Sequence, residues 1–516
     1  MNEFEKLYKI RQVLDENIAK NALFKLSVKE AIECVMIKVG MLFPFFQRGD
    51  YEKKQEYMKR LIRTNATYID EILFFQESLK WICRWCMKYC DNNGKQNDVK
   101  IKADDVYKLM GVAYAYNEFV KYSFFHSKKV ALYREFGNCL QFDYLNEESQ
   151  QVHQLYDTLI RKMSEKKDLE DIMMKNKNNN DIKIMEIVHR RDFDFSYNFN
   201  FGKFTLKDYE EISTALNNYI MRKKKNSHIL NPGVAGITKC KRVELVEMLI
   251  KESGICKEKV EEVVNFFTYK MDDKNGDLSL NYFFEMDNDE IMLSEGIFSM
   301  QRAAVNDLRV LAKSHKEQYD KEQNMFEIEQ KNRIKKIIKK RYMVANNLSK
   351  EQEIRPGMDM LVYDKLNNHL QVIELKYKIP VESEMDTINL DKMLEKAYLQ
   401  VGWARKYVEE HEEILTEYFG TEYKGIIPDA IDYFVITNYS IGTGVKCQLP
   451  TPILLEEHYL QLMQCDDGMR RVSKVISDKN KCIIKTIKKR YARYGLIDFK
   501  IKIPEAITNG NYNCLL

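Results

Sequence analysis

The chain has 516 residues, of which 45% are hydrophobic and 31% charged, and its formal net charge is +4. This length exceeds one ordinary hydrophobic core, so we expect two to four domains of a globular protein. The small net charge excludes binding of nucleic acid through overall charge, and any basic surface must therefore be local.

Cysteine usage and the first residues bear on the compartment. The 11 cysteines are an odd number scattered from Cys34 to Cys514, which predicts no disulfide framework. The start, MNEFEKLYKIRQVL, is charged and helical rather than typical of a signal peptide. The most apolar early stretch, CVMIKVGMLFPFF, is interrupted by Lys38 and too short to span a bilayer. We therefore expect a cytoplasmic protein without membrane contact.

Residues 1–230 are predicted to form a helical domain of unknown role. In residues 71–90 apolar side chains recur at spacings of three and four, and the aromatic-rich stretch 106–136 also favours helices. Three cysteines in the first stretch, Cys83, Cys86 and Cys90, have a spacing compatible with a metal cluster or with a helical core. No fourth ligand lies nearby, so we favour the core. The polar run 175–181 predicts a loop.

Residues 231–312 are predicted to form a connecting module of a helical hairpin and a β-hairpin. Residues 241–267 form two predicted helices around Ser253-Gly254, which fit a DNA-reading helix-turn-helix or a plain helical hairpin. We favour the plain hairpin because no cluster of base-reading side chains stands out. Asn275-Gly276, between two alternating runs, predicts a β-hairpin.

From about residue 313 the pattern changes to helix, strand, strand, helix and strand. The helices are expected at 324–342 and 390–415, and the strands at 358–364, 370–378 and 431–437. This alternation predicts an α/β layer over residues 313–465, so the whole chain is expected to be α+β and multidomain. Residues 466–516 are expected to form a basic extension, with a helix at 483–495 and a last strand at 497–504.

Three charges stand in the apolar strands at 358–364 and 370–378. Asp359 shares one strand face with Leu361 and Tyr363, and Glu374 and Lys376 share a face of the next strand. Unpaired buried charge is costly, so buried charges are normally paired or bound to metal. Two carboxylates on one face would form an oxygen-ligand site for a hard cation such as Mg²⁺, and the lysine could orient a water.

The preceding helix adds a third acid. At about 100° per residue, Ile334 and Ile338 lie within about 20° of Glu327, whereas Glu329 lies about 200° away. Glu327 is therefore expected in the apolar stripe that faces the sheet, and Glu329 on the solvent face.

These residues resemble the motif of the PD-(D/E)XK nuclease superfamily, which has the restriction-endonuclease-like fold. The motif consists of Asp359, Glu374 and Lys376 on consecutive strands, after a helix that carries Glu327, and the resemblance covers about residues 315–440. It implies a central mixed sheet flanked by helices and a phosphodiesterase dependent on Mg²⁺ or Mn²⁺.

The resemblance also implies the role of each residue. Asp359 and Glu374 would be metal ligands, Glu327 would bind a second metal or act through water, and Lys376 would position the attacking water. Gln400 resembles the helix glutamine of some branches, although Ala404 stands where those branches often have tyrosine.

Two basic clusters are candidates for phosphate contact. The alternative for both clusters is a solvent-exposed face that binds no phosphate. The candidates are Lys336 and Lys340 on the Glu327 helix, and Lys488, Lys489, Arg490 and Arg493 near the C-terminus.

The expected function is a magnesium-dependent endonuclease, with DNA as the expected substrate although RNA stays open. By analogy it would serve in bacterial defence against foreign DNA, with the N-terminal helices binding a partner protein or a second copy. The alternative is a non-catalytic nucleic-acid-binding or scaffolding subunit with a relic nuclease fold.

Overall fold

The structure is a computed structural model of the chain. It describes residues 2–48, 50–90, 100–145, 198–227, 237–270, 277–278, 280–295, 297–298, 304–338, 340–348, 358–379, 383–411, 413–420, 423, 427–438, 442–443, 452–477 and 487–508. The predicted loop at 175–181 and the Asn275-Gly276 pair lie outside these residues.

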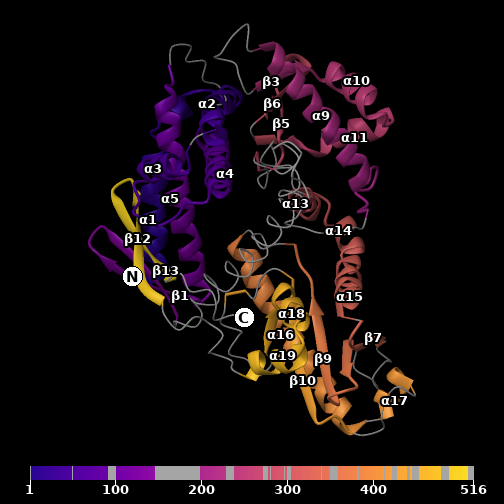
Figure 1. Ribbon diagram of the computed structural model, residues 1–516. Helices are drawn as coiled ribbons and strands as arrows, with labels where there is room; N and C mark the ends of the chain where they lie inside the picture. Colours follow the sequence, from indigo (N-terminus) through magenta and orange to yellow (C-terminus); the bar gives the residue numbers. More distant parts are fainter. Residues whose placement is uncertain are drawn as a thin grey trace.

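The chain begins with a helical bundle, as predicted (Figure 1). Side-chain caps start several of its helices, because Asn2, Asp50 and Asp70 accept hydrogen bonds from first-turn amides. The bundle consists of α1 (Glu3–Ile18), the 3₁₀ helix η1 (Ala22–Lys25), α2 (Val28–Arg48), α3 (Tyr51–Ile62), α4 (Glu71–Tyr89) and α5 (Ala103–Ser127). Cys83 and Cys86 are buried in the core beneath α4, which confirms the core interpretation for these two.

Two segments far apart in sequence complete this N-terminal part as a four-stranded sheet. The sheet has the order β1-β2-β13-β12 and is formed by β1 (Ala131–Phe136), β2 (Cys139–Tyr144), β12 (Ile487–Leu496) and β13 (Phe499–Thr508). The helix predicted at 483–495 is wrong where the chain is described, since residues 487–496 form a strand. Ala492, Tyr494 and Leu496 are buried and alternate with more exposed residues, which is the period of a strand. The end of the stretch at 106–136 is likewise the strand β1 and not helix.

The connecting module has helices on a small sheet of order β3-β6-β5-β4. The two helices predicted around Ser253-Gly254 are confirmed, and Gly254 ends the first in the left-handed conformation, with φ 71°. The elements are α9 (Leu206–Ser227), β3 (Ile237–Lys241), α10 (Arg242–Ser253), α11 (Lys257–Phe266), β4 (Thr268–Tyr269), β5 (Phe283–Glu285), the 3₁₀ helix η4 (Asp287–Asp289) and β6 (Glu290–Ser294). The predicted β-hairpin is wrong: β4 and β5, which flank Asn275-Gly276, pair in parallel, and β5 pairs antiparallel with β6.

The next part is an α/β layer with a five-stranded mixed sheet of order β11-β10-β9-β8-β7. Two helices, α13 (Ala304–Ser314) and α14 (Lys316–Glu322), lead into it. The layer consists of α15 (Asn324–Ile338), β7 (Met343–Leu348), β8 (Met358–Asp364), β9 (His369–Lys376), α16 (Glu384–Glu410), α17 (Glu413–Phe419), β10 (Ala430–Thr437), β11 (Ile453–Leu455), α18 (Glu456–Met463) and α19 (Gly468–Ser477). Each strand and helix predicted between 324 and 437 is present, whereas β7, β11, α18 and α19 were not predicted.

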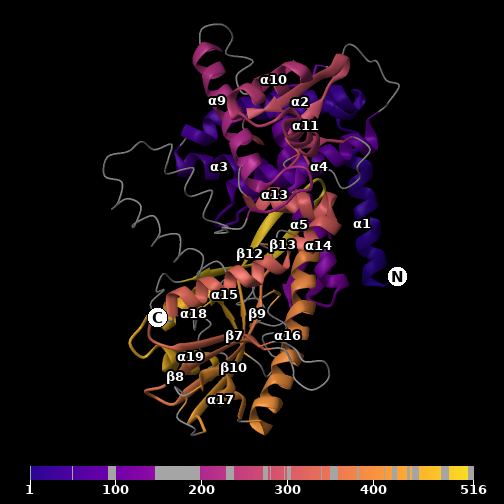
Figure 2. The same ribbon diagram turned by 90° about the vertical axis from the view of Figure 1, so that its right-hand side faces the viewer.

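Each face of this sheet has its own apolar core. One core joins Met360, Ile373 and Phe434 to α15, α18 and α19. The other joins Leu361, Val372 and Val435 to α16 and α17. The sheet therefore lies between two helical layers, with α16 on one side and α18 and α19 on the other (Figure 2). Helices and three mixed sheets make the described part of the protein α+β. None of its helices combines the length and apolar character needed to cross a membrane.

Candidate active site

The two predicted carboxylates lie close together at one end of the ladder between strands β8 and β9. The antiparallel ladder runs from Asp364↔His369 to Met360↔Ile373, and Asp359 and Glu374 are the next residues on their strands. The backbone N–H of Leu375 donates to Asp359 Oδ2 at 2.8 Å. The negative charge of Asp359 also raises the pKa of Glu374, as expected for two nearby carboxyls. The end of the ladder therefore brings two acids together.

Glu374 and Lys376 are buried and paired with each other. Glu374 is 5% exposed and Lys376 is 9% exposed, and Lys376 Nζ donates to Glu374 Oε1 at 2.6 Å. Both lie on the central strand β9, where Glu374 pairs with Val435 of β10 and Lys376 with Thr437. Residues two apart point to the same side of a strand. Their burial excludes a position of this pair on a solvated face of the sheet.

Helix α15 supplies a third acid and a second lysine. Lys331 Nζ lies 3.2 Å from Asp359 Oδ1, and both side chains are mostly buried. Glu327, four residues earlier and thus on the same helix face, is partly buried. The inward position of Glu327 was predicted, but Lys331 was missed. Its spacing of four residues from Glu327 was the available signal.

The sequence of α15 fixes the position of these two side chains. Ile334 and Ile338 are buried in the core beneath the helix. On the next turn from Glu327, Gln330 and Arg333 both donate to the buried carboxylate of Glu456 at the start of α18, at distances of 2.5–3.1 Å. These contacts hold α15 against the sheet along most of its length.

The charges of the cluster act strongly on one another. Burial and the negative charges of Asp359 and Glu327 together raise the pKa of Glu374 to about 8, although Lys376 opposes the shift. Burial also raises the pKa of Glu327; Lys376 and Lys331 lower it, and Asp359 raises it. Burial alone would lower the pKa of Lys376, but Glu374, Asp359 and Glu327 raise it above its usual value. The acids and lysines of the cluster thus strongly shift one another's protonation.

This donor set fits a divalent cation held by two protein carboxylates. Asp359 and Glu374 offer the oxygens that Mg²⁺ prefers, and Mg²⁺ commonly keeps several waters beside one or two carboxylates. Within the described residues, no three His, Cys, Asp or Glu side chains gather closely enough to hold a metal. The role of Glu327, as a ligand of a second metal or through water, therefore stays a prediction.

The other predicted residues are not part of this cluster. Gln400 is partly buried on the flank of α16, and no hydrogen bond or ion pair of the described residues joins it to the cluster. Lys336 and Lys340 are exposed. Lys488 and Lys489 lie in β12, and their side chains are outside the described part.

The two arginines of β12 have different surroundings. Arg490 Nη2 donates to the backbone oxygen of Asn65 at 2.6 Å, so this guanidinium binds the N-terminal bundle. Arg493 is exposed. The predicted basic helix with one phosphate-binding face is therefore corrected to a strand whose side chains point to two sides.

A second polar cluster lies at the opposite end of β9. Asp432 Oδ2 and Ser473 Oγ both contact His369 Nε2, at 2.8 and 3.2 Å, and Ser473 also donates to Asp432 at 2.5 Å. A serine triad needs the imidazole to bridge its partners through both ring nitrogens. Here both partners meet one nitrogen, so the cluster fastens α19 to the sheet and has no relay geometry.

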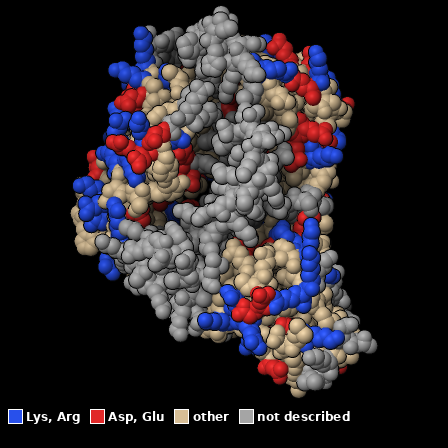
Figure 3. Space-filling view, viewed as in Figure 1, with Lys and Arg blue, Asp and Glu red and all other residues tan. Residues whose placement is uncertain are grey.

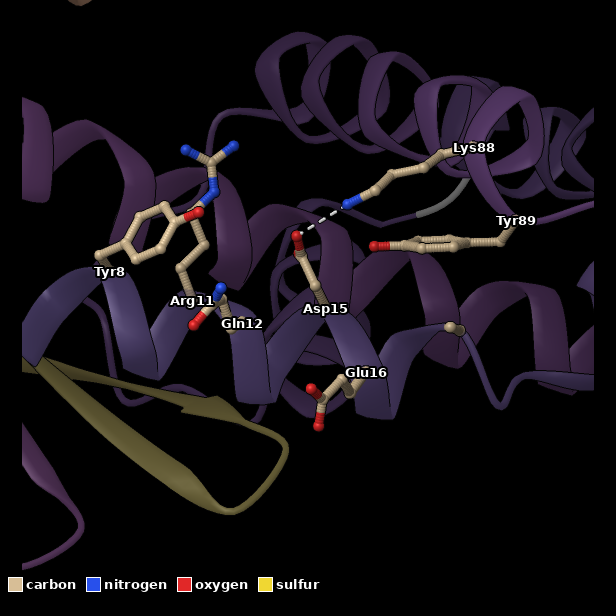
Figure 4. A pocket seen from close by; sticks show the side chains of 8 residues that line it. Tyr8, Arg11, Gln12, Asp15, Glu16, Lys88 and Tyr89 are labelled. Atoms are coloured by element: carbon tan, nitrogen blue, oxygen red, sulfur yellow. Dashed lines mark hydrogen bonds and ion pairs between the residues drawn. The ribbon is translucent and has the colours of Figure 1, made fainter.

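An open groove of about 450 Å³ lies between α1 and the end of α4 (Figure 4). Lys88 Nζ donates to Asp15 Oδ2 at 3.0 Å, and Tyr116 donates to Asp15 Oδ1 at 2.7 Å. Its main charged groups are thus satisfied within the protein, and it lies in a different part of the fold from the Asp359 cluster.

The Asp359–Glu374–Lys376 cluster is therefore the arrangement with the clearest chemical capacity. Comparisons with protein-family models, curated protein sequences and solved structures found no match to this chain.

Proposed function

We propose that the protein is a metal-dependent endonuclease of the PD-(D/E)XK type. The observation that carries this proposal is the closeness of Asp359 and Glu374 at the end of a strand ladder, with the Lys376 ammonium 2.6 Å from Glu374. Buried charges are normally paired or bound to metal, and here the lysines pair with the acids. Phosphodiester hydrolysis needs charge neutralisation and a positioned water, and a divalent cation held between carboxylates would supply both.

Each side chain has a role in this mechanism. A divalent cation, when bound, neutralises the phosphate and lowers the pKa of a water. Asp359 and Glu374 would hold that cation, and Lys376 would orient the attacking water and stabilise the developing charge. Lys331, which contacts Asp359, would contact a phosphate oxygen. Glu327 would order a water beside the acids.

DNA is the proposed substrate, and defence against foreign DNA the proposed setting. Lys336, exposed on α15, and Lys340, exposed just after the helix, are proposed contacts to the nucleic-acid backbone. A relic nuclease fold that only binds nucleic acid or a partner is the second candidate. The retained charges favour catalysis over this candidate, because a relic has no physical reason to keep them buried.

The test is incubation of the purified protein with plasmid, single-stranded DNA and RNA, with Mg²⁺, with Mn²⁺ or with chelator. Metal-dependent cleavage is expected for the wild type and loss of cleavage for Asp359→Asn, which keeps an oxygen for the Leu375 amide. Asp364→Asn is the matched control: it lies at the far end of β8, where Asp364 caps the turn to β9. Full cleavage by Asp359→Asn would refute the assignment. Binding without cleavage by the wild type would favour the relic fold.

A further inference from the structure

The four-stranded sheet of the N-terminal part has one face turned away from the helices. Its inward residues, including Leu140, Phe142 and Ile501, are fully buried in the core with α5. Strand residues alternate between faces, so the residues between these point outward. The outward face thus belongs to strands from both ends of the chain.

One row of this outward face crosses all four strands and carries three cations. The register pairs Arg134 of β1 with Gln141 of β2, Gln141 with Lys502 of β13, and Lys502 with Arg493 of β12. Arg134 and Arg493 are exposed, and Lys502 and Gln141 are partly exposed. Adjacent strands are about 4.8 Å apart, so the row is about 14 Å long. No ion pair within the described residues engages its three cations.

A second row adds two cations. Lys500 of β13 is exposed and pairs with Cys139 of β2 on one side and with Gly495 of β12 on the other. The Arg63 side chain lies against Gly495, where an added Cβ would be 2.8 Å from Arg63 Nε. Glycine is therefore required at this position for Arg63 to lie on the sheet face.

One acid, Asp143, lies on β2 beside these rows. It is 6% exposed and accepts hydrogen bonds from Tyr491 and from Gln141 Nε2, the latter at 3.1 Å. These partners lie on the sheet itself. Figure 3 shows Lys and Arg side chains along the edge of the molecule where β12 lies in Figure 1.

Aromatic surface borders the cations. Phe136, at the end of β1 and paired with Cys139, is 58% exposed, and Tyr491 of β12 is partly exposed. Exposed aromatic rings on a four-stranded sheet stack unpaired bases while nearby cations follow the phosphates. A flat sheet face offers no helix or ribbon that could enter the major groove of a duplex.

We propose that the outward face of β1, β2, β13 and β12 binds single-stranded nucleic acid. Arg134, Lys502 and Arg493 contact successive phosphates, Lys500 and Arg63 extend the contact along the strand, and Phe136 stacks on one base. This site is separate from the Asp359 cluster and does not depend on cleavage. DNA and RNA share the chemistry that it recognises.

The test measures binding in chelator, where no cleavage occurs. Fluorescent oligothymidylate and oligouridylate of about 15 nucleotides, within the site sizes of small binding folds, are titrated with wild type and with Arg134→Gln/Arg493→Gln/Lys502→Gln. Loss of three phosphate contacts should weaken binding by about 10-fold or more and reduce the salt slope by about 2. Phe136→Ala should weaken it by about 10-fold through the lost stacking.

The matched control is Lys108→Gln/Lys203→Gln/Lys257→Gln, which removes the same charge from residues 66–72% exposed in surface ion pairs elsewhere. It should bind like the wild type, and all variants should keep its melting temperature. Equal binding by the two triple variants would overturn the proposal, as would equally strong competition by a duplex of the same length. Asp359→Asn should bind normally, so failure of the proposed nuclease activity would leave this result unchanged.

Discussion

Replacing Glu374 by Gln should stabilise the metal-free protein at pH 8. Burial, and the negative charges of Asp359 and Glu327, raise the pKa of Glu374 from 4.5 to about 8 in the folded protein. A raised carboxyl pKa means that the folded state holds this proton more tightly than the unfolded state. The stability of the protein therefore falls as the pH rises from about 4.5 to about 8.

The structure sets the size of this effect. A difference of one in pKa corresponds to about 1.4 kcal/mol, so the change at Glu374 amounts to about 5 kcal/mol as an upper limit. Gln removes the charge but also the ion pair with Lys376, whose ammonium then faces Asp359 and Glu327. If the lost ion pair cancels about half of the upper limit, the free energy of unfolding still rises by about 2 kcal/mol at pH 8. For a domain of 150–250 residues this raises the melting temperature by about 4–8 °C.

The assay is thermal unfolding of the wild type and Glu374→Gln between pH 5 and pH 8 in chelator, repeated with Mn²⁺. The two proteins should melt together at pH 5, where the carboxyl holds its proton, and diverge as the pH rises. Mn²⁺ should stabilise the wild type more at pH 8 than at pH 6 and should leave the variant unchanged. Glu410→Gln, an exposed change on α16, is the control. A variant that is less stable at pH 8, or a difference that does not depend on pH, would refute the reasoning.

Three further predictions concern single side chains. Glu327→Gln should lower the cleavage rate by about 10- to 100-fold. Glu329→Gln should leave the cleavage rate almost unchanged, because Glu329 points to another side of α15. Equal effects of the two changes in the cleavage assay would show that the helix is rotated. Lys376→Ala should bind nucleic acid almost normally but lose about 100-fold or more in single-turnover rate, and a variant that turns over normally would remove Lys376 from the mechanism. Gly111→Ala should destabilise the bundle by about 1–3 kcal/mol, because the added Cβ would overpack against α3. Gly402→Ala, on the open side of α16, should raise the melting temperature slightly. Similar shifts in melting temperature for the two variants would contradict the close approach of α3 and α5.

The part of the fold that carries the acids could be predicted because its signals are local. The strands β8 and β9 are short apolar runs joined by a short polar turn, which predicts the hairpin. The shared face of Glu374 and Lys376 follows because residues two apart point to the same side of a strand. The apolar stripe of α15 placed Glu327 inward by the same kind of argument. Lys331 was missed because the argument followed acids in apolar positions and did not ask which cation one turn away would balance them.

The C-terminal strands could not be predicted because distant residues decide them. KKRYARY carries charges and aromatics that suit a helix or a strand. Its pairing with β13, and the bond from Tyr491 to Asp143, 348 residues apart, select the strand. At β1 and β2 the long helical pattern hid a turn at Gly137, whose φ of 56° reverses the chain.

The pairing of β13 with β2 makes the two ends of the chain parts of one folding unit. A fragment that stops before β12 would lack half of the first sheet and would leave the apolar face of α5 partly bare. Conversely, a single protease cut anywhere between β2 and β12 would leave two pieces still joined through this ladder. The α/β layer is thus inserted into the N-terminal unit and secured at both of its ends. For expression of the N-terminal unit alone, both β1–β2 and β12–β13 must be included, although they lie at opposite ends of the chain. The α/β layer alone corresponds to the inserted residues between them.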